Sequence, residues 1–414
     1  MSVFTAGGHS ALEVNPDGVR EADIVLALFS ADNAENMEFA VAKASGGAAR
    51  YHPELKSVLV CADAASGDGT RDAFFKAPSE TPRLYVSTSE DPAERTKRIC
   101  FFNAVETAAR LKAKYVVTFD ASTVTLKKTW LPRLLDPLIK NGACYTSPLY
   151  SRHLFDLPVT YLLSYPMFRA LFGRRIRNPH LGDLAFTGEL NSVFLESAWP
   201  AEPDFCSTEL AAAAIAVSHG PVFQSFMGDP RVGKERLPVD ISIGESFCRT
   251  LASFYQLMEL YPELWKKPRN SRPTPVTGAD LKAEILPPRE LVGPPGAFTA
   301  LISNSARETR EIWEGEFASH LPLWQVLKDP PAGGVKVPAA DWADLVYRGA
   351  AAYRCLTDRR EMVVRALMPV FLARLLEFKL LTSAPSASAV PSQIEAECVV
   401  FEKAKPKLVA LWGD

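Results

Sequence analysis

The chain has 414 residues, of which 47% are hydrophobic and 23% are charged, as in an ordinary globular protein and unlike a disordered or fibrous one. Its 46 basic and 48 acidic residues give a formal net charge of −2, so no overall field attracts it to nucleic acid or to an anionic membrane. Residues 1–23 lack the features of a signal peptide and no apolar run approaches the roughly 18 residues of a membrane-spanning helix, so we expect a cytoplasmic protein without a transmembrane segment and without a nucleic-acid partner.

Short apolar runs alternate with helical patterns over the first 150 residues. Strands are expected at residues 23–29, 57–61, 84–87, 115–119 and 143–149, and helices at 34–49, 71–76, 97–112 and 129–141. Alternation of this kind implies right-handed crossovers and a mostly parallel sheet flanked by helices. The predicted fold class is therefore α/β and Rossmann-like.

The second half of the chain is dominated by helical patterns. Further strands are expected at residues 186–194 and 222–227, with an alanine-rich helix at 207–217 between them. Helical patterns follow at 243–260, 342–381 and 393–412, and a proline-dense connector occupies 266–295. We therefore expect a sheet domain over residues 1–240 and a helical C-terminal region over residues 241–414.

Three aspartates come directly after predicted strands. Asp32, Asp63 and Asp120 would meet at the edge of a parallel sheet where ligands bind, beyond the carboxyl ends of the strands. A carboxylate there can accept hydrogen bonds from base N–H groups and ribose hydroxyls. Each aspartate alone could equally cap a helix or form a loop turn, but the three together indicate a nucleotide site.

Several segments resemble one enzyme family. The sequence DAASGDGT at residues 63–70 is similar to the D-x-x-S-x-D-G-T loop of family-two-like glycosyltransferases, and DAS at 120–122 stands where those enzymes carry a D-x-D motif. Residues 97–104 are similar to the basic turn and helix start that precede that motif. TGEL at 187–190 and the acid-bearing segment 204–211 resemble elements of bacterial mannosylglycerate and glucosyl-3-phosphoglycerate synthases, and residues 365–378 resemble their C-terminal helices more loosely. The resemblance implies the A-type glycosyltransferase fold.

The resemblance also implies roles for individual residues. Asp32 and Asp63 would hold the base or ribose, and Asp120 would lie at the ribose or metal region. Lys97 and Arg98, or Arg95, would bind the diphosphate. Glu189 would contact the sugar, and Glu209 or Asp204 would lie near the acceptor hydroxyl. Departure of a nucleoside diphosphate leaves negative charge on phosphate and positive charge on the sugar. Catalysis therefore needs a cation at the diphosphate and a carboxylate near the sugar.

The resemblance further implies a divalent metal ion, Mg²⁺ or Mn²⁺, at Asp120 and at position 122. Such hard cations prefer carboxylate oxygens, yet position 122 is Ser122. Residues 229–236 also lack the histidine that relatives use as a metal ligand. A fixed positive charge from Lys234 or Arg236 could replace the ion, which would make catalysis metal-free or weak.

Two functions follow as expectations. The first is a glycosyltransferase that moves a hexose from a nucleoside-diphosphate sugar to a small hydroxyl acceptor such as a glycerate-like acid; the alternative is a catalytically weakened or inactive binding protein of the same fold. A nucleotidyltransferase is disfavoured because no G-x-G-x-R loop with a following lysine succeeds the first strand. Aromatic residues of the tail, including Trp313, Trp324 and Trp342, could frame the acceptor, pack a core or form a homodimer interface.

Overall fold

The computed structural model describes residues 3–4, 12–87, 97–180, 182–200, 207–233, 238–283, 285–294, 296–384 and 387–413. The chain forms two compact units. Unit 1 comprises Met1–Ser151, Asn178–Arg236 and Thr274–Leu286, and unit 2 comprises Arg152–Arg177, Leu237–Pro273 and Pro287–Asp414. Part of the helical unit therefore precedes residue 240, and part of the sheet unit follows it.

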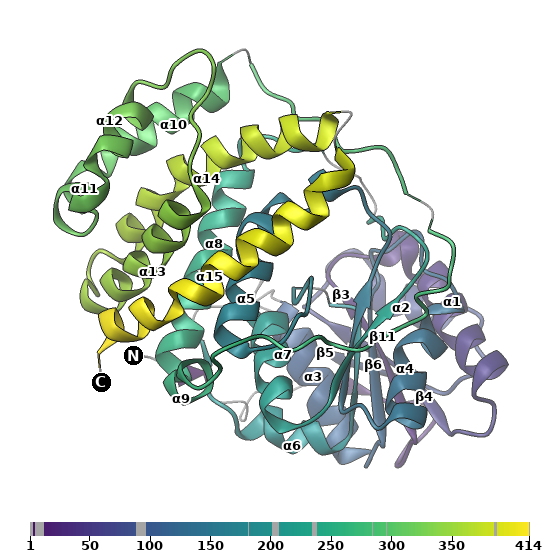
Figure 1. The fold of residues 1–414 in the computed structure, drawn as a ribbon. Helices are drawn as coiled ribbons and strands as arrows, with labels where there is room; N and C mark the ends of the chain where they lie inside the picture. The colour runs from purple at the N-terminus through teal and green to yellow at the C-terminus, as the bar shows by residue number, and fades with distance from the viewer. Residues whose placement is uncertain are drawn as a thin grey trace. The chain divides into compact units, whose positions relative to one another are not determined.

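Unit 1 is built on a nine-stranded sheet (Figure 1). Its strands are β2 (Leu12–Val14), β3 (Ile24–Ser30), β4 (Ser57–Asp63), β5 (Arg83–Ser87), β6 (Tyr115–Asp120), β7 (Tyr145–Leu149), β8 (Leu184–Thr187), β10 (Val222–Phe226) and β11 (Val276–Thr277). Their order across the sheet is β11-β10-β7-β8-β6-β3-β4-β5-β2, and only β2 and β8 run antiparallel to their neighbours. A separate two-stranded sheet pairs β1 (Val3–Phe4) with β9 (Trp199–Pro200).

Helices cover both faces of this sheet. They are α1 (Ala34–Tyr51), α2 (Thr70–Lys76), α3 (Lys97–Arg110), α4 (Trp130–Asn141), α6 (Glu189–Glu196) and α7 (Ser207–His219). Every residue of β3 is buried, as expected for a central strand that is covered on both sides. The predicted α/β class, with a mostly parallel sheet flanked by helices, is confirmed.

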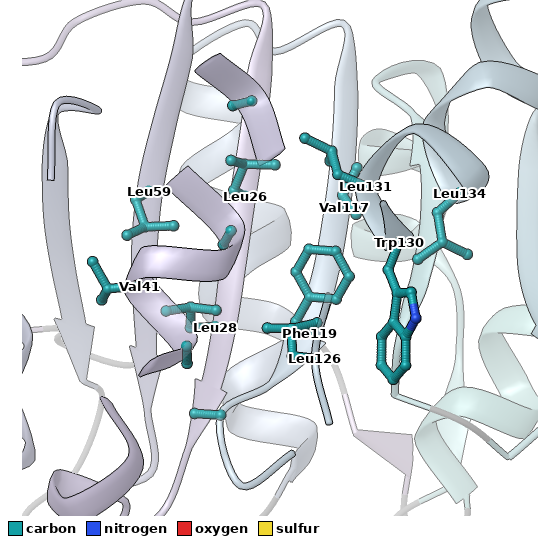
Figure 2. Packing of buried hydrophobic residues seen from close by; sticks show 14 of the residues in the cluster. Leu26, Leu28, Val41, Leu59, Val117, Phe119, Leu126, Trp130, Leu131 and Leu134 are labelled. Atoms are coloured by element: carbon teal, nitrogen blue, oxygen red, sulfur yellow. The ribbon is translucent and has the colours of Figure 1, made fainter. Parts of the chain in front are cut away.

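One face of the sheet packs against α1 and α4 (Figure 2). Apolar side chains of β3, β4 and β6 meet Val41 of α1 and Trp130, Leu131 and Leu134 of α4. Full burial of such a side chain contributes about 1.5–3 kcal/mol to folding. On the other face, aromatic rings of α3 and α6 surround Trp199: the ring centroid of Trp199 lies 5.6 Å from that of Phe101, 5.0 Å from that of Phe102 and 6.1 Å from that of Phe194.

The strands and helices predicted within the first 150 residues are all present, with ends within two residues of the predicted ones. The strand predicted at 186–194 is wrong beyond Thr187, because α6 begins at Glu189. Buried Leu190 and Phe194 are four residues apart, which is the spacing of one helix face. The apolar run 186–194 therefore crosses from a strand into a helix and does not form one strand.

Unit 2 is helical. It contains two short helical turns, Leu154–Asp156 and Thr160–Ser164, followed by α5 (Tyr165–Phe172), α8 (Ile243–Leu260), α9 (Pro262–Lys266), α10 (Ala297–Glu308), α11 (Arg310–Gly315), α12 (Leu321–Lys328), α13 (Ala339–Cys355), α14 (Arg360–Ser383) and α15 (Val390–Trp412). The predicted C-terminal helical extension is thus confirmed. No helix in the described part of the chain is long and apolar enough to cross a membrane.

The tryptophans of the tail pack in the core of this unit. The side chain of Trp342 is fully buried, and its indole N–H donates to the carbonyl oxygen of Leu162 at 2.8 Å. Phe247 and Phe371 stack beside it with ring centroids 4.3 Å apart. Trp313 is also fully buried, so neither of these two indoles lies on an exposed acceptor surface.

A lysine is buried in unit 2. The Nζ of Lys405 on α15 donates to the carbonyl oxygens of Leu171, at 3.3 Å, and of Pro268, while 3% of the residue is exposed. Burial lowers the pKa of this ammonium to about 7. The unfolded chain therefore binds a proton more strongly than the folded chain between pH 7 and the ordinary lysine pKa of 10.5.

Stability should consequently rise with pH above 7. We expect the free energy of unfolding of the wild type, measured against Lys405→Met, to increase by up to about 1.4 kcal/mol per pH unit across that window. The matched control is Lys403→Met at an exposed position on the same helix; it keeps Lys405, so the wild type measured against it should show no such slope. Urea titrations at several pH values measure both, and equal slopes for the two variants would contradict the expectation.

Candidate functional site

The carboxyl ends of three adjacent parallel strands form one edge of the unit 1 sheet. β3 lies between β4 and β6, with Ser30 opposite Asp63 and Phe29 opposite Asp120. Asp63 and Asp120 therefore lie two strand spacings apart, roughly 10 Å. Asp32 follows β3 directly, so the strand ends carry all three predicted aspartates to the same edge.

Hydrogen bonds join the loop after β3 to the loop after β4. The backbone N–H of Asp32 donates to Ser66 Oγ at 2.7 Å, and the N–H of Gly67 donates back to Asp32 Oδ1 at 2.8 Å. Asp32 has a φ of 53°, a left-handed conformation that aspartate tolerates better than most residues. The two loops thus hold each other in one fixed arrangement.

Asp68 ties both helices to these loops. Its Oδ2 accepts from the N–H of Ala34, the first residue of α1, at 2.9 Å. Its Oδ1 accepts from the N–H and hydroxyl of Thr70, the first residue of α2, at 3.0 and 2.6 Å. One carboxylate therefore satisfies backbone donors at two helix N-termini, a favourable place for negative charge. Burial alone would raise the pKa of Asp68, but these hydrogen bonds outweigh it and lower the pKa.

Asp63 lies beneath its loop. Its carboxylate is fully buried and accepts from the N–H and hydroxyl of Ser66 at 2.7 and 2.6 Å and from the hydroxyl of Tyr85 at 2.8 Å. Burial and the adjacent carboxylate raise the pKa of Tyr85 well above its usual value, so its hydroxyl stays protonated and donates. Asp63 thus stabilises the loop from inside. Asp32, in contrast, is exposed to solvent.

A charged cluster surrounds Asp120. Its Oδ1 accepts from the N–H and hydroxyl of Ser122 at 3.0 and 2.6 Å, and its Oδ2 accepts from a terminal nitrogen of Arg231 at 3.1 Å. The Nε of Arg231 donates to Oδ2 of Asp183. Asp183 Oδ1 in turn accepts from the backbone N–H of Asp120 at 2.9 Å, and the Tyr150 hydroxyl donates to Oδ2 at 2.9 Å. We call Asp120, Asp183 and Arg231 the Asp120 cluster.

Strand direction explains why Asp183 belongs to this cluster. β8 runs antiparallel to β6, with Leu184 opposite Thr118, so the residue that precedes β8 lies at the carboxyl end of β6. Asp183 is fully buried, whereas the Arg231 side chain is 15% exposed. Burial alone would lower the pKa of Arg231, but the carboxylates of Asp183 and Asp120 raise it above its usual value. The guanidinium is therefore a permanent cation.

Glu209 lies next to this cluster. It stands in the first turn of α7 and is 2% exposed. A β-carbon built on Gly182 would lie 3.4 Å from Glu209 Oε1, which places this carboxylate beside the residue that precedes Asp183. Glu209, one of the predicted acids, thus lies close to the Asp120 cluster.

Glu189 lies near the opposite end of the strands, where β6 begins. It follows β8, whose last residue Thr187 pairs with Tyr115 at the start of β6. Asp120 stands five positions after Tyr115 along β6, which corresponds to roughly 17 Å. The structure does not bring Glu189 together with Asp32, Asp63 and Asp120, because β8 reverses direction relative to β6.

The remaining predicted residues differ in how much the structure describes. The backbone of Lys97 opens α3, and the thiol of Cys100 in the same turn donates to the carbonyl oxygen of Ser30, which places this turn at the same sheet edge. Arg98 is 3% exposed and donates to the carbonyl oxygen of Pro200. The predicted positions outside the described residues are Arg95, Asp204, Lys234 and Arg236.

The donor set at Asp120 does not fit a divalent metal ion. Both oxygens of Asp120 already accept hydrogen bonds, and Ser122 contributes a neutral hydroxyl that donates to Asp120. A guanidinium also stands within 3.1 Å of the carboxylate. In the described part of the chain, no three histidine, cysteine or acidic side chains gather as metal ligands would.

Comparisons with known proteins give the following. No family model and no curated protein matches the chain. Similar solved structures include glucosyl-3-phosphoglycerate synthase from Mycobacterium tuberculosis in complex with Mn²⁺, UDP and glucosyl-3-phosphoglycerate, at 17% sequence identity over 57% of this chain and 79% of that chain, with a TM-score of 0.43. The same enzyme with Mn²⁺, UDP-glucose and glycerol 3-phosphate gives the same values, and a further mycobacterial protein gives 19% identity over 57% and 74% with a TM-score of 0.43.

Proposed function

We propose that this chain is a glycosyltransferase that moves a hexose from a nucleoside-diphosphate sugar to a small hydroxyl acceptor. One observation carries the proposal: adjacent parallel strands deliver Asp32 and Asp120 to one sheet edge, where the D-x-x-S-x-D-G-T loop is fixed by hydrogen bonds. Ligands of open α/β sheets bind at this edge. The ligand class follows from the motif resemblance and from carboxylates that suit ribose and base donors.

The proposed division of tasks follows the geometry. Asp32 and Asp120 would face the nucleoside, and the first turn of α3, where Lys97 stands, would lie toward the diphosphate. Glu209 would accept the proton of the acceptor hydroxyl, since a buried carboxylate at hydrogen-bond distance from a hydroxyl can act as a general base. A glycerate-like acid is the acceptor that we would try first.

A second candidate is a protein that binds a nucleotide sugar without turnover. It is favoured by one feature, the engagement of both Asp120 oxygens by Ser122 and Arg231. Binding of UDP-glucose or GDP-mannose with no detectable release of UDP or GDP, with or without an acceptor, would select this function over catalysis.

Thermal-shift and turnover measurements test the proposal. At a ligand concentration of 100 Kd, UDP or GDP should stabilise the wild type by about 2.7 kcal/mol, and Asp120→Asn should lose this stabilisation. Glu209→Gln should still bind but release UDP or GDP from the sugar donor at least about 100-fold more slowly in the presence of glycerate or 3-phosphoglycerate. The control is Glu38→Gln, an exposed carboxylate on α1, which should behave as wild type.

One further variant separates the two sheet edges. Glu189→Gln should reduce turnover less than Glu209→Gln, because the end of β8 that precedes Glu189 lies roughly 17 Å along β6 from Asp120. If no nucleotide stabilises the wild type, or if Asp120→Asn is stabilised equally, the proposed function is wrong.

A further inference from the structure

We infer that the guanidinium of Arg231 is the fixed cation of the Asp120 cluster and takes the place that a divalent metal ion would need beside Asp120. The inference concerns the charge balance of the cluster itself. It rests on the proposed function only where a nucleotide is used as the probe.

The first observation is the direction of the Arg231 contacts. Its Nε donates to Asp183 and a terminal nitrogen donates to Asp120 at 3.1 Å, so one planar side chain bridges both carboxylates. Guanidinium groups suit such bridges because their donors are fixed in a fork and their charge is permanent. Arg231 thus supplies a positive charge to both carboxylates, as a bridging cation would.

The second observation is the burial of Asp183. Its side chain is fully buried and its hydrogen bonds come from Tyr150, from the backbone of Asp120 and from Arg231. An ionised carboxylate in such a position costs several kcal/mol unless a cation is close. The fold itself therefore retains Arg231 at the cluster, whether or not a ligand is present.

The third observation concerns space and repulsion. A hard divalent ion binds carboxylate oxygens at about 2.0–2.6 Å, closer than the Arg231 nitrogen that now stands 3.1 Å from Asp120 Oδ2. The ion would have to displace the Ser122 donors from Oδ1, displace the guanidinium from Oδ2, or share Oδ2 with it. Displacement of the guanidinium would leave Asp183 without its cation, and retention would place two positive groups side by side. Either route disfavours metal binding.

A direct metal titration gives the first arm of the test. Mn²⁺ binding, followed by electron paramagnetic resonance and by calorimetry, should be no stronger for the wild type than for Asp120→Asn. Arg231→Ala removes the guanidinium that contacts both carboxylates and should bind Mn²⁺ at least about tenfold more tightly than the wild type. Arg231→Lys keeps the charge and should bind Mn²⁺ as weakly as the wild type.

One result in this arm overturns the inference. The inference is wrong if the wild type binds one Mn²⁺ and the Asp120→Asn variant binds none. Circular dichroism checks that each variant is folded. Should Arg231→Ala fail to fold, the comparison of the wild type with Asp120→Asn still decides the outcome.

Nucleotide affinity gives the second arm. The Kd of the wild type for UDP or GDP, whichever binds, should agree within about twofold between EDTA and Mn²⁺. Binding that requires Mn²⁺ overturns the inference and leaves the proposed function intact. Absence of nucleotide binding in both solutions refutes the proposed function, and the metal titration alone then decides the role of Arg231.

Discussion

Arg169→Ala should destabilise the helical unit by about 3–5 kcal/mol. Arg169 of α5 is 1% exposed, and its Nε donates to Glu402 Oε1 of α15 at 2.9 Å. A terminal nitrogen also donates to Glu395, whose other oxygen accepts from the hydroxyl of Tyr165 at 2.9 Å. Removal of the arginine leaves Glu402, which is 12% exposed, without its buried cation. Hydrogen exchange of the α5 and α15 amides during urea denaturation measures the loss.

Two matched variants test this account. Arg307→Ala removes an arginine from an ion pair with Asp329 in which both side chains are more than half exposed, and it should cost less than about 1 kcal/mol. The triple variant Arg169→Met, Glu395→Gln, Glu402→Gln removes the stranded charges and should recover much of the stability. A cost for Arg169→Ala no larger than that for Arg307→Ala would contradict a role for buried charge.

Gly188→Ala should destabilise the sheet unit by at least about 3 kcal/mol. Gly188 stands between β8 and α6, and its N–H donates to the carbonyl oxygen of Lys114 at 2.7 Å. A β-carbon at this position would lie 2.0 Å from the carbonyl oxygen of Ala113, a backbone atom that has no rotamer to change. The backbone before β6 would have to move. Urea denaturation with hydrogen exchange of the β6 and β8 amides measures the effect.

The control for this clash is Gly233→Ala. A β-carbon on Gly233 meets no atom within 4 Å, so the substitution should change the free energy of unfolding by no more than about 0.5 kcal/mol. If both alanine variants are equally stable, close backbone approach is not the reason for glycine at position 188.

The central fold could be predicted from sequence because each of its strands and helices has a recognisable local pattern. The run IVLALF of β3 is short, apolar and stopped by polar loop residues, and α1 then begins at Ala34. The prediction failed at residues 186–194, where β8 passes into α6 through Gly188. The local sequence does not show why glycine stands at this change, because the backbone that approaches Gly188 is that of Ala113.

The candidate site was only partly predictable for a related reason. The rule that ligands bind at strand ends identifies Asp32 and Asp120, since β3 and β6 are parallel. Asp183 was missed because the antiparallel pairing of β8 with β6 cannot be read from either strand alone. The same reversal places Glu189 at the far edge.

The cation illustrates how loops limit prediction. A fixed positive charge was expected from residues 229–236, at Lys234 or Arg236, and Arg231 of that segment contacts Asp120. Irregular segments have no period that would tell which side chain turns inward. The expectations for Lys234 and Arg236 stay predictions, since both lie outside the described residues.

The interleaving of the two units has a consequence for synthesis on the ribosome. The strand β11, Val276–Thr277, pairs with β10 at the edge of the sheet, yet the segment Leu237–Pro273 of the helical unit is made before it. During translation, the backbone groups of β10 that pair with β11 therefore lack this partner until β11 has been synthesised. Exposed strand edges of this kind invite pairing with other chains. A nascent or truncated chain that stops before Val276 should consequently be more prone to aggregate than the full-length protein.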